Sequence, residues 1–150
     1  MQISTVRTRI AAAAAAGVTM PTGAPPLKCT GYTPDSIVAP HFFVAEYTQD
    51  YDKTMRRGID ELEFTCRVLV SRADDRSSQE VLDALLSGTG TASLKAAIEA
   101  ARGAPGERAL DGAADDLHVM RVQGYRWYEH EGTQYVGAEL IIKVIGKGDA

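Results

Sequence analysis

The chain has 150 residues and a formal net charge of -4, with 45% hydrophobic and 24% charged residues. This length suits one domain spanning residues 1–150, and the composition is that of a folded globular protein rather than a disordered or membrane-spanning one. A mildly acidic chain lacks the clustered Lys and Arg that hold nucleic-acid phosphates, so stable DNA binding is not expected.

The N-terminal segment places Arg7 and Arg9 before the alanine run 11–16, which imitates the charged and apolar regions of a secretory signal. Alanine is a weak hydrophobe, however, and apolar or small residues recur at helical spacing: Ile3, Val6, Ile10, Ala13, Ala14 and Gly17. We therefore predict an amphipathic helix over 3–16 with the arginines on its solvent side. It should stop at Gly17, which tolerates the left-handed conformation common after helices. No apolar run is long enough to cross a bilayer.

Two short strands are predicted next, over 27–32 and 37–46, with a turn at Thr33-Pro34-Asp35-Ser36 between them. A polar loop is predicted over 47–58.

The most regular pattern follows this loop. One face of the next strand carries Leu62, Phe64, Cys66, Val68 and Val70, and the other carries Glu61, Glu63, Thr65 and Arg67. Ser77 and Glu80 then have the spacing of a capping box, which satisfies the free backbone donors at the start of a helix. That helix has an apolar stripe of Val81, Leu82, Leu85 and Leu86, and Gly88 is predicted to end it.

The second half of the chain predicts a short helix over 93–101, a surface loop over 102–114 and a long hairpin. The hairpin strands are expected over 117–129 and 135–145, around Glu131-Gly132. The order α-β-β-β-α-α-β-β predicts an α+β fold with a single mostly antiparallel sheet and helices packed on one face.

No constellation in the chain resembles a reaction centre, so we expect no enzyme activity, no metal and no cofactor. His41, His118 and His130 are scattered and lack a recognisable catalytic partner. Cys29 and Cys66 have no metal-ligand spacing and are expected to be buried thiols, with a disulfide between them disfavoured.

Two further patterns imitate ligand sites. The segment 88–95 contains glycines, hydroxyl residues and a lysine, but it lacks the GxxxxGK[ST] spacing of a phosphate loop. The acidic clusters Asp74-Asp75 and Asp111 with Asp115-Asp116 lack the alternating oxygen ligands of a calcium loop.

The polar loop is the candidate interaction site, because Tyr, Met and Arg are enriched in protein interfaces. On these residues alone, an interface and a merely solvated loop are equally supported. The candidate subunit or partner contacts are Tyr47, Asp50, Tyr51, Asp52, Met55, Arg56 and Arg57. We expect Arg56 and Arg57 to pair with carboxylates across the interface.

Several segments, taken in order, resemble the tail terminator proteins of long-tailed (siphovirus-type) phages of actinobacteria. The resemblance covers mainly 47–95 and 117–144, and it does not extend to the alanine run or to the Pro-rich segment 21–26. The similar segments are Tyr51-Asp52, Arg57-Gly58-Ile59-Asp60-Glu61, Asp75-Arg76-Ser77-Ser78-Gln79, Leu85-Leu86-Ser87-Gly88, Ser93-Leu94-Lys95-Ala96-Ala97-Ile98-Glu99, Gly124-Tyr125 and Tyr135-Val136-Gly137-Ala138-Glu139.

This resemblance implies a tail-terminator-like fold and a homo-oligomeric ring, usually of six subunits. The ring caps the completed tail tube, stops its polymerisation and forms the docking surface for the head connector. Its implied partners are the tail tube protein and a head-tail connector or stopper protein, and DNA passes through the lumen without specific binding. The implied location is the head-proximal end of the virion tail, after assembly in the host cytoplasm and without a membrane.

Two alternatives stay open. The chain resembles a tail terminator but is also compatible with another head-tail connector component, either a stopper or a tail tube subunit. A small-molecule enzyme with a cleft beside the sheet is a third hypothesis, which the missing catalytic motifs disfavour.

Overall fold

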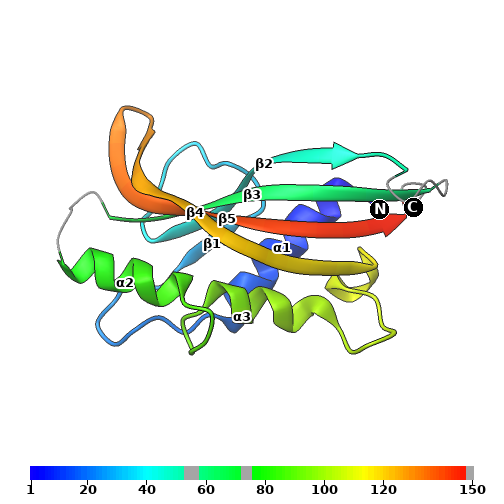
Figure 1. The fold of residues 1–150 in the computed structure, drawn as a ribbon. Coiled ribbons are helices and arrows are strands. Elements are labelled where there is room, and N and C mark those ends of the chain that lie inside the picture. The colour runs from blue at the N-terminus through cyan, green and yellow to red at the C-terminus, as the bar shows by residue number, and fades with distance from the viewer. Residues whose placement is uncertain (53–57, 72–75, 148–150) are drawn as a thin grey trace.

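The computed structural model describes residues 1–52, 58–71 and 76–147. The elements follow the predicted order (Figure 1), and their bounds are α1 (Ile3–Gly17), β1 (Lys28–Thr30), β2 (His41–Asp50), β3 (Ile59–Ser71), α2 (Arg76–Leu86), α3 (Leu94–Glu99), the 3-10 turns η1 (Ala100–Arg102) and η2 (Leu110–Gly112), β4 (Asp116–His130) and β5 (Thr133–Lys147). None of the described helices is both long enough and apolar enough to span a membrane.

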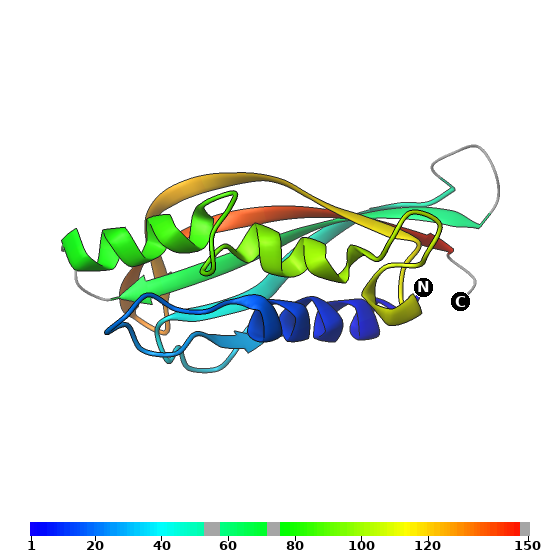
Figure 2. The same cartoon turned by 90° about the horizontal axis from the view of Figure 1, so that it is seen from below.

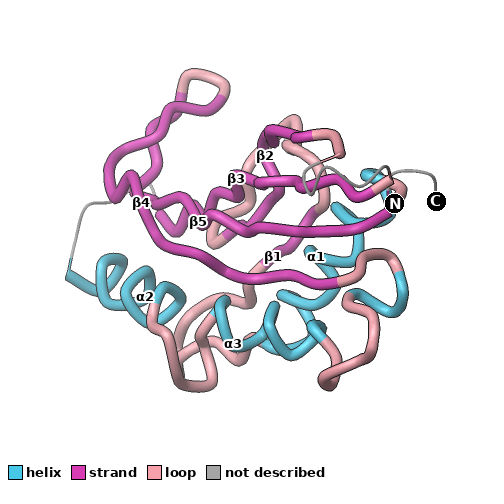
Figure 3. Tube along the Cα trace, turned by 45° about the vertical axis from the view of Figure 1, so that its right-hand side comes forward, coloured by secondary structure: helices cyan, strands magenta, loops and turns pink. Residues whose placement is uncertain are grey.

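The strands form one sheet in the order β1-β2-β3-β5-β4. The short β1 runs parallel to β2, whereas the other three pairings are antiparallel. The predicted α+β class with a mostly antiparallel sheet is therefore confirmed. β1 and β4 are the outermost strands, β2 forms the edge beyond the short β1, and β3 and β5 lie between β2 and β4 (Figure 3).

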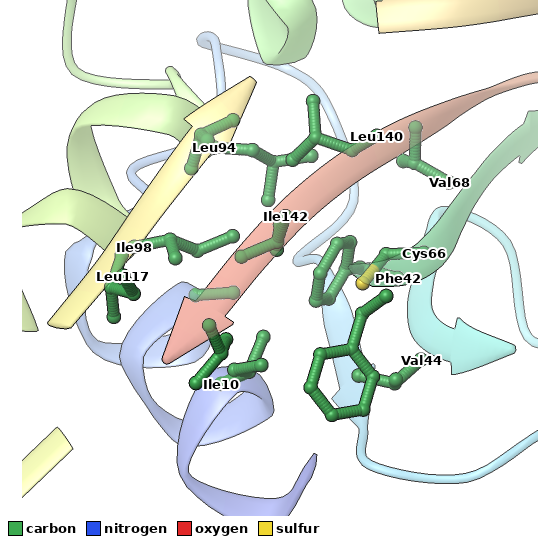
Figure 4. Close-up of a cluster of buried hydrophobic side chains, with 14 of the residues drawn as sticks. Ile10, Phe42, Val44, Cys66, Val68, Leu94, Ile98, Leu117, Leu140 and Ile142 are labelled. Carbon is green, nitrogen blue, oxygen red and sulfur yellow. The ribbon is translucent and has the colours of Figure 1, made fainter. Parts of the chain in front are cut away.

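The helices cover one face of the sheet (Figure 2). The main core lies between the helices and this face, and its residues come from strands and helices far apart in sequence. Ile10 of α1, Leu94 and Ile98 of α3, and Phe42, Cys66, Leu140 and Ile142 of the sheet point into it (Figure 4). The alternation predicted for β3 is confirmed, because Leu62, Phe64, Cys66 and Val68 are fully buried on this face.

The opposite face, which we call the open face, carries a smaller apolar cluster. Phe43, Leu69, Tyr128 and Tyr135 form it where the tip of the β4-β5 hairpin curls over the sheet (Figure 1). The hairpin turn lies at Glu131 and Gly132, as predicted, and both have positive φ, at 51° and 77°. Two consecutive positive φ values define the tight turn that best matches the twist of paired strands.

The first helix is confirmed, but its arginines and its final glycine have other roles than expected. Arg7 and Arg9 are half-buried and donate to backbone carbonyls instead of simply facing water. Gly17 ends the helix without a positive φ. A Cβ there would lie 2.7 Å from the Cβ of Ala97, so the glycine lets α1 approach α3 closely.

The strand bounds near β1 and β2 differ from the prediction. β2 begins at His41, because proline at position 40 has no backbone N–H to donate to the sheet. β2 also continues to Asp50, so residues 47–50 are strand rather than loop. A register shift between Val44 and Glu46 lets the strand continue along β3 despite the break in hydrophobic alternation.

Two further predictions were wrong in detail. α2 already includes Arg76, so Ser77 lies inside the helix, and the Glu80 carboxylate accepts a hydrogen bond from Arg76 at 2.9 Å instead of closing a capping box. The segment 102–114 is not wholly on the surface, since Leu110 is buried. The Leu110 carbonyl accepts a hydrogen bond from Arg9 at 2.7 Å.

Candidate interaction surface

The stem of the β2-β3 connection is organised by one buried carboxylate. Asp60 is only 7% exposed, and its two oxygens accept from the Asp52 backbone N–H at 3.2 Å and the Gln49 side-chain amide at 3.3 Å. Asp52 has a positive φ of 50°, and its own carboxylate accepts from the Gly58 N–H at 2.9 Å. Asp52 is one of the predicted interface residues. These contacts give it a structural role at the base of the connection.

The two predicted tyrosines differ in setting. Tyr47 is 41% exposed on β2, and its ring lies 5.7 Å from that of Phe64. Tyr51 is 73% exposed in the turn after β2. Asp50 is exposed at the end of β2, while Met55, Arg56 and Arg57 lie outside the described residues. The described candidates thus form a strand edge and a turn instead of one loop.

Charged side chains cross the open face from strand to strand. Arg67 on β3 is 3.1 Å from the buried Glu139 on β5 and 3.8 Å from Glu46 on β2. The outer strand adds Arg126, 3.8 Å from Glu139, and Arg121, 3.6 Å from Glu63. The Arg121 and Arg126 side chains are about half exposed, and exposed ion pairs of this length contribute little to stability, so these two arginines remain available for contacts with another molecule.

Arg7 covers part of the outer edge of β2. Because β1 pairs only with the first residues of that strand, the Val44 and Ala45 carbonyls lie just beyond it. The Arg7 guanidinium donates to them at 2.8 and 3.1 Å and to the Gly31 carbonyl at 2.9 Å. The backbone edge of β2 from Glu46 to Asp50 lies beyond the carbonyls that Arg7 covers. Edge strands of native sheets are commonly protected by such side chains.

Glu99 covers part of the outer edge of β4, as Arg7 does for β2. Glu99 of α3 accepts from the Val119 backbone N–H at 3.3 Å and from Lys95 at 2.8 Å, and it lies 3.4 Å from His118. Burial alone raises the pKa of Glu99, but hydrogen bonds from Lys95 and Val119 and the nearby cations outweigh burial and hold the pKa below its ordinary value. Beyond Val119, the Tyr128 hydroxyl donates to the Gly124 carbonyl, and no other side-chain hydrogen bond within the described ranges reaches the β4 backbone between Met120 and Trp127.

The part of β4 beyond Val119 also exposes large apolar side chains, which are not among the predicted interface residues: Met120, Val122, Tyr125 and Trp127. They alternate irregularly with charges because the strand contains register shifts between 119 and 121 and between 123 and 126. Because of these shifts, the alternation of every second residue along the sequence does not identify this exposed set. Their sequence signal is the clustering of Met, Tyr and Trp with arginines, which marks interfaces.

The other sequence candidates are used within the fold. The Ser93 hydroxyl caps α3 by accepting from Ala96 N–H at 3.1 Å, so the connection 88–93 is a helix-to-helix link as expected. Asp116 is bound by Arg102 at 2.7 and 3.1 Å, which lowers the pKa of its carboxyl, and Asp115 lies 3.2 Å from Arg108. Asp111 is exposed, and Asp74-Asp75 lies outside the described residues.

The histidines and cysteines occupy separate places. His41 is fully buried with Nε2 3.0 Å from the Thr30 hydroxyl, and its ring packs against Phe43. Burial, Lys28 and His130 together lower the pKa of His41 to about 4. Both cysteines are free thiols, and burial raises the pKa of Cys29 to about 11. Within the ranges given above, no three His, Cys, Asp or Glu side chains gather as a metal site.

A groove of about 910 Å³ lies between the segment 21–25, the end of β3 and α2. Its described lining is mainly apolar, with Ile37, Val70 and Val81, and its charged member is Glu80. Because Glu80 is paired with Arg76 and the described lining has no histidine, cysteine or lysine, this groove offers no nucleophile with an adjacent base.

The chain matches no protein-family model, and no curated protein matches it.

Proposed function

We propose that the chain is a structural assembly protein, a phage tail terminator that forms a ring at the head-proximal end of a completed tail tube. The observation that carries this proposal is the one-sided construction of the domain. The helices and main core occupy one face of the sheet, while the open face and the free edges of β2 and β4 present charged and aromatic side chains. Such a domain is built to contact neighbours through the sheet.

The resemblance of segments in 47–95 and 117–144 to tail terminators supplies the particular role. In that role the ring has two unlike faces. One face binds the tail tube and the other accepts the head connector, so that no further tube ring adds. The acidic balance of the chain favours passage of DNA through the lumen, because like charge prevents adhesion.

The experiment is deletion of the gene from the phage that encodes it, with complementation in trans. We expect deletion to give tails of uncontrolled length that do not join heads, and complementation to restore normal particles. Gold-labelled antibody should then mark the junction between head and tail.

Two results would redirect the proposal. Labelling along the whole tail would identify a tube subunit instead. If normal infectious particles form without the protein, it has no required role in the tail.

A further inference from the structure

β4 forms one margin of the sheet, and β2 forms the other beyond the three residues that pair with β1. The two strands run in opposite directions. β2 is antiparallel to β3, β3 to β5, and β5 to β4, so the outer strands are antiparallel to one another. If a second copy lies beside the first in the same orientation, its β2 meets the first copy's β4 as an antiparallel neighbour. Antiparallel pairing is the commoner and slightly more stable kind. The direction of the chain therefore permits a sheet that continues from copy to copy.

The two free edges carry opposite charge on the open face. Glu46 and Asp50 of β2 pair with Thr65 and Glu61, which are four positions apart on β3. Arg121 and Arg126 of β4 belong to the rows of Ile141 and Gly137, which are four positions apart on β5. The register shift between residues 123 and 126 absorbs the extra residue of β4. Acids and bases thus have the same spacing along the two edges.

From this match we propose that β2 of one copy binds antiparallel to β4 of a second copy, along the parts of both edges that Arg7 and Glu99 leave uncovered. The spacing sets the register through three facing pairs, which are Glu46 with Arg126, Thr48 with Gln123 and Asp50 with Arg121. This pairing deepens the proposed function, because it specifies how neighbouring copies join within the ring.

Arg121, Arg126 and Glu46 keep exposed side chains beside their present contacts. These contacts include the Gln123 Oε1 atom, 3.3 Å from Arg121 Nε, and the Tyr128 ring, 4.8 Å from the Arg126 guanidinium. The Arg121 and Arg126 side chains are 49% and 59% exposed, and their distances of 3.6 and 3.8 Å to carboxylates of their own copy are long for ion pairs. The Glu46 side chain is 69% exposed. A neighbouring carboxylate beside each arginine would complete the charge pattern, and opposite charges directly across a strand pair are stabilising.

The contact is heterologous because two different edges meet, so it generates a closed ring or an open filament rather than a two-fold dimer. A strand pair of about five residues buries less than a standard protein interface. Individual contacts are therefore weak, and ring closure stabilises them together.

A cysteine pair tests the register directly. Within one copy, positions 48 and 123 are separated by β3 and β5, about 14 Å at roughly 4.8 Å per strand, which is beyond the reach of a disulfide. A Thr48→Cys, Gln123→Cys double variant, oxidised at its highest soluble concentration, should run without thiol as a ladder at multiples of 16.1 kDa. The same sample should run as the monomer after thiol is added. The matched control is Thr48→Cys with Val122→Cys, because Val122 is exposed on the same strand but belongs to the opposite face.

We expect a ladder from the first variant and no more than collisional dimers from the control. Equal ladders, or none from either, would overturn the proposed pairing. Micrographs of the same samples and the antibody labelling of phage particles separate this failure from that of the proposed function. Rings without the specific disulfide reject this interface alone, whereas absence of label from the head-tail junction rejects the tail role.

A charge exchange tests the chemistry. Glu46→Arg with Asp50→Arg reverses one edge, and Arg121→Glu with Arg126→Glu reverses the other. In low salt, sedimentation of either variant alone should show loss of association, whereas an equimolar mixture should regain it because each contact again joins opposite charges. Regained association also shows that both variants are folded. If each variant associates as the unchanged protein does, or if the mixture does not recover, the proposal is wrong.

Discussion

The Arg7 guanidinium donates to the Val44 carbonyl at 2.8 Å, which fixes the first helix against the outer edge of β2. The same guanidinium lies 4.4 Å from the centre of the Tyr32 ring. One side chain of α1 therefore closes an edge of the sheet and holds the segment after β1.

We predict that Arg7→Ala destabilises the fold by about 1–3 kcal/mol, because buried carbonyls lose a charged donor. Arg7→Lys should recover only part of this, since an ammonium group cannot reproduce the forked contacts with several carbonyls. Urea unfolding measures both effects. Thr8→Ala, at an exposed position of the same helix, is the control and should stay within about 0.5 kcal/mol of the unchanged protein. Equal effects at the two positions would contradict the role of Arg7.

A second prediction compares two glycines. Gly17→Ala should destabilise the fold by about 1–3 kcal/mol, because the added Cβ would lie 2.8 Å from the Ala97 Cα and force α1 away from α3. Gly88→Ala adds a Cβ in open space and should be neutral or stabilise by up to about 1 kcal/mol. Thermal unfolding of the two variants distinguishes them. If Gly17→Ala is also neutral, the close approach of the helices does not explain that glycine.

A third prediction concerns pH. Burial, Lys28 and His130 hold the pKa of folded His41 near 4, below its ordinary 6.5, so the unfolded chain binds more protons between these values. The contribution of His41 to stability should be constant above about pH 6.5 and fall as the pH drops toward 4, by at most about 3.5 kcal/mol at about 1.4 kcal/mol per pKa unit.

Urea midpoints at pH 7.5, 6 and 5 test this slope. His41→Gln should flatten it between pH 6.5 and 5 whatever its effect on stability at pH 7.5. Thr8→Ala, which removes no titratable group, is the control and should leave the slope unchanged. The carboxyls of Glu99 and Asp116, whose pKa values are also lowered, lose their contributions at lower pH, so they do not mask the window of His41. An unchanged slope in His41→Gln would contradict the assignment.

A fourth prediction is that the protein needs no metal or nucleotide. Its acidic pair Asp115-Asp116 is already bound by Arg108 and Arg102, and the Ser93 hydroxyl is used as a helix cap. Thermal unfolding with chelator, Mg²⁺, Ca²⁺ or ATP should therefore agree within about 1 °C. A ligand that binds the folded state stabilises it by mass action, so a reproducible shift of several degrees would reopen the enzyme hypothesis.

The amino-acid sequence by itself determined the elements whose signal is local. The alternation from Leu62 to Val70 identified β3 and its buried face, helical spacing identified α1, and Glu131-Gly132 identified the hairpin turn. These signals succeed because the period of a strand or helix and the conformation of a tight turn depend on neighbouring residues only.

Only the tertiary structure decided which residues share an edge. β2 extends through residues 47–50 because β3 supplies hydrogen-bonding partners for its backbone. The residues of this segment do not by themselves indicate that pairing. Arg7 and Glu99 cover strand edges more than thirty and about twenty residues away, at Val44 and Val119. Strand order likewise places Glu46 and Arg126 at opposite margins of one sheet. Such relations arise from long-range pairing and packing, which depend on the whole fold rather than on the residues nearby.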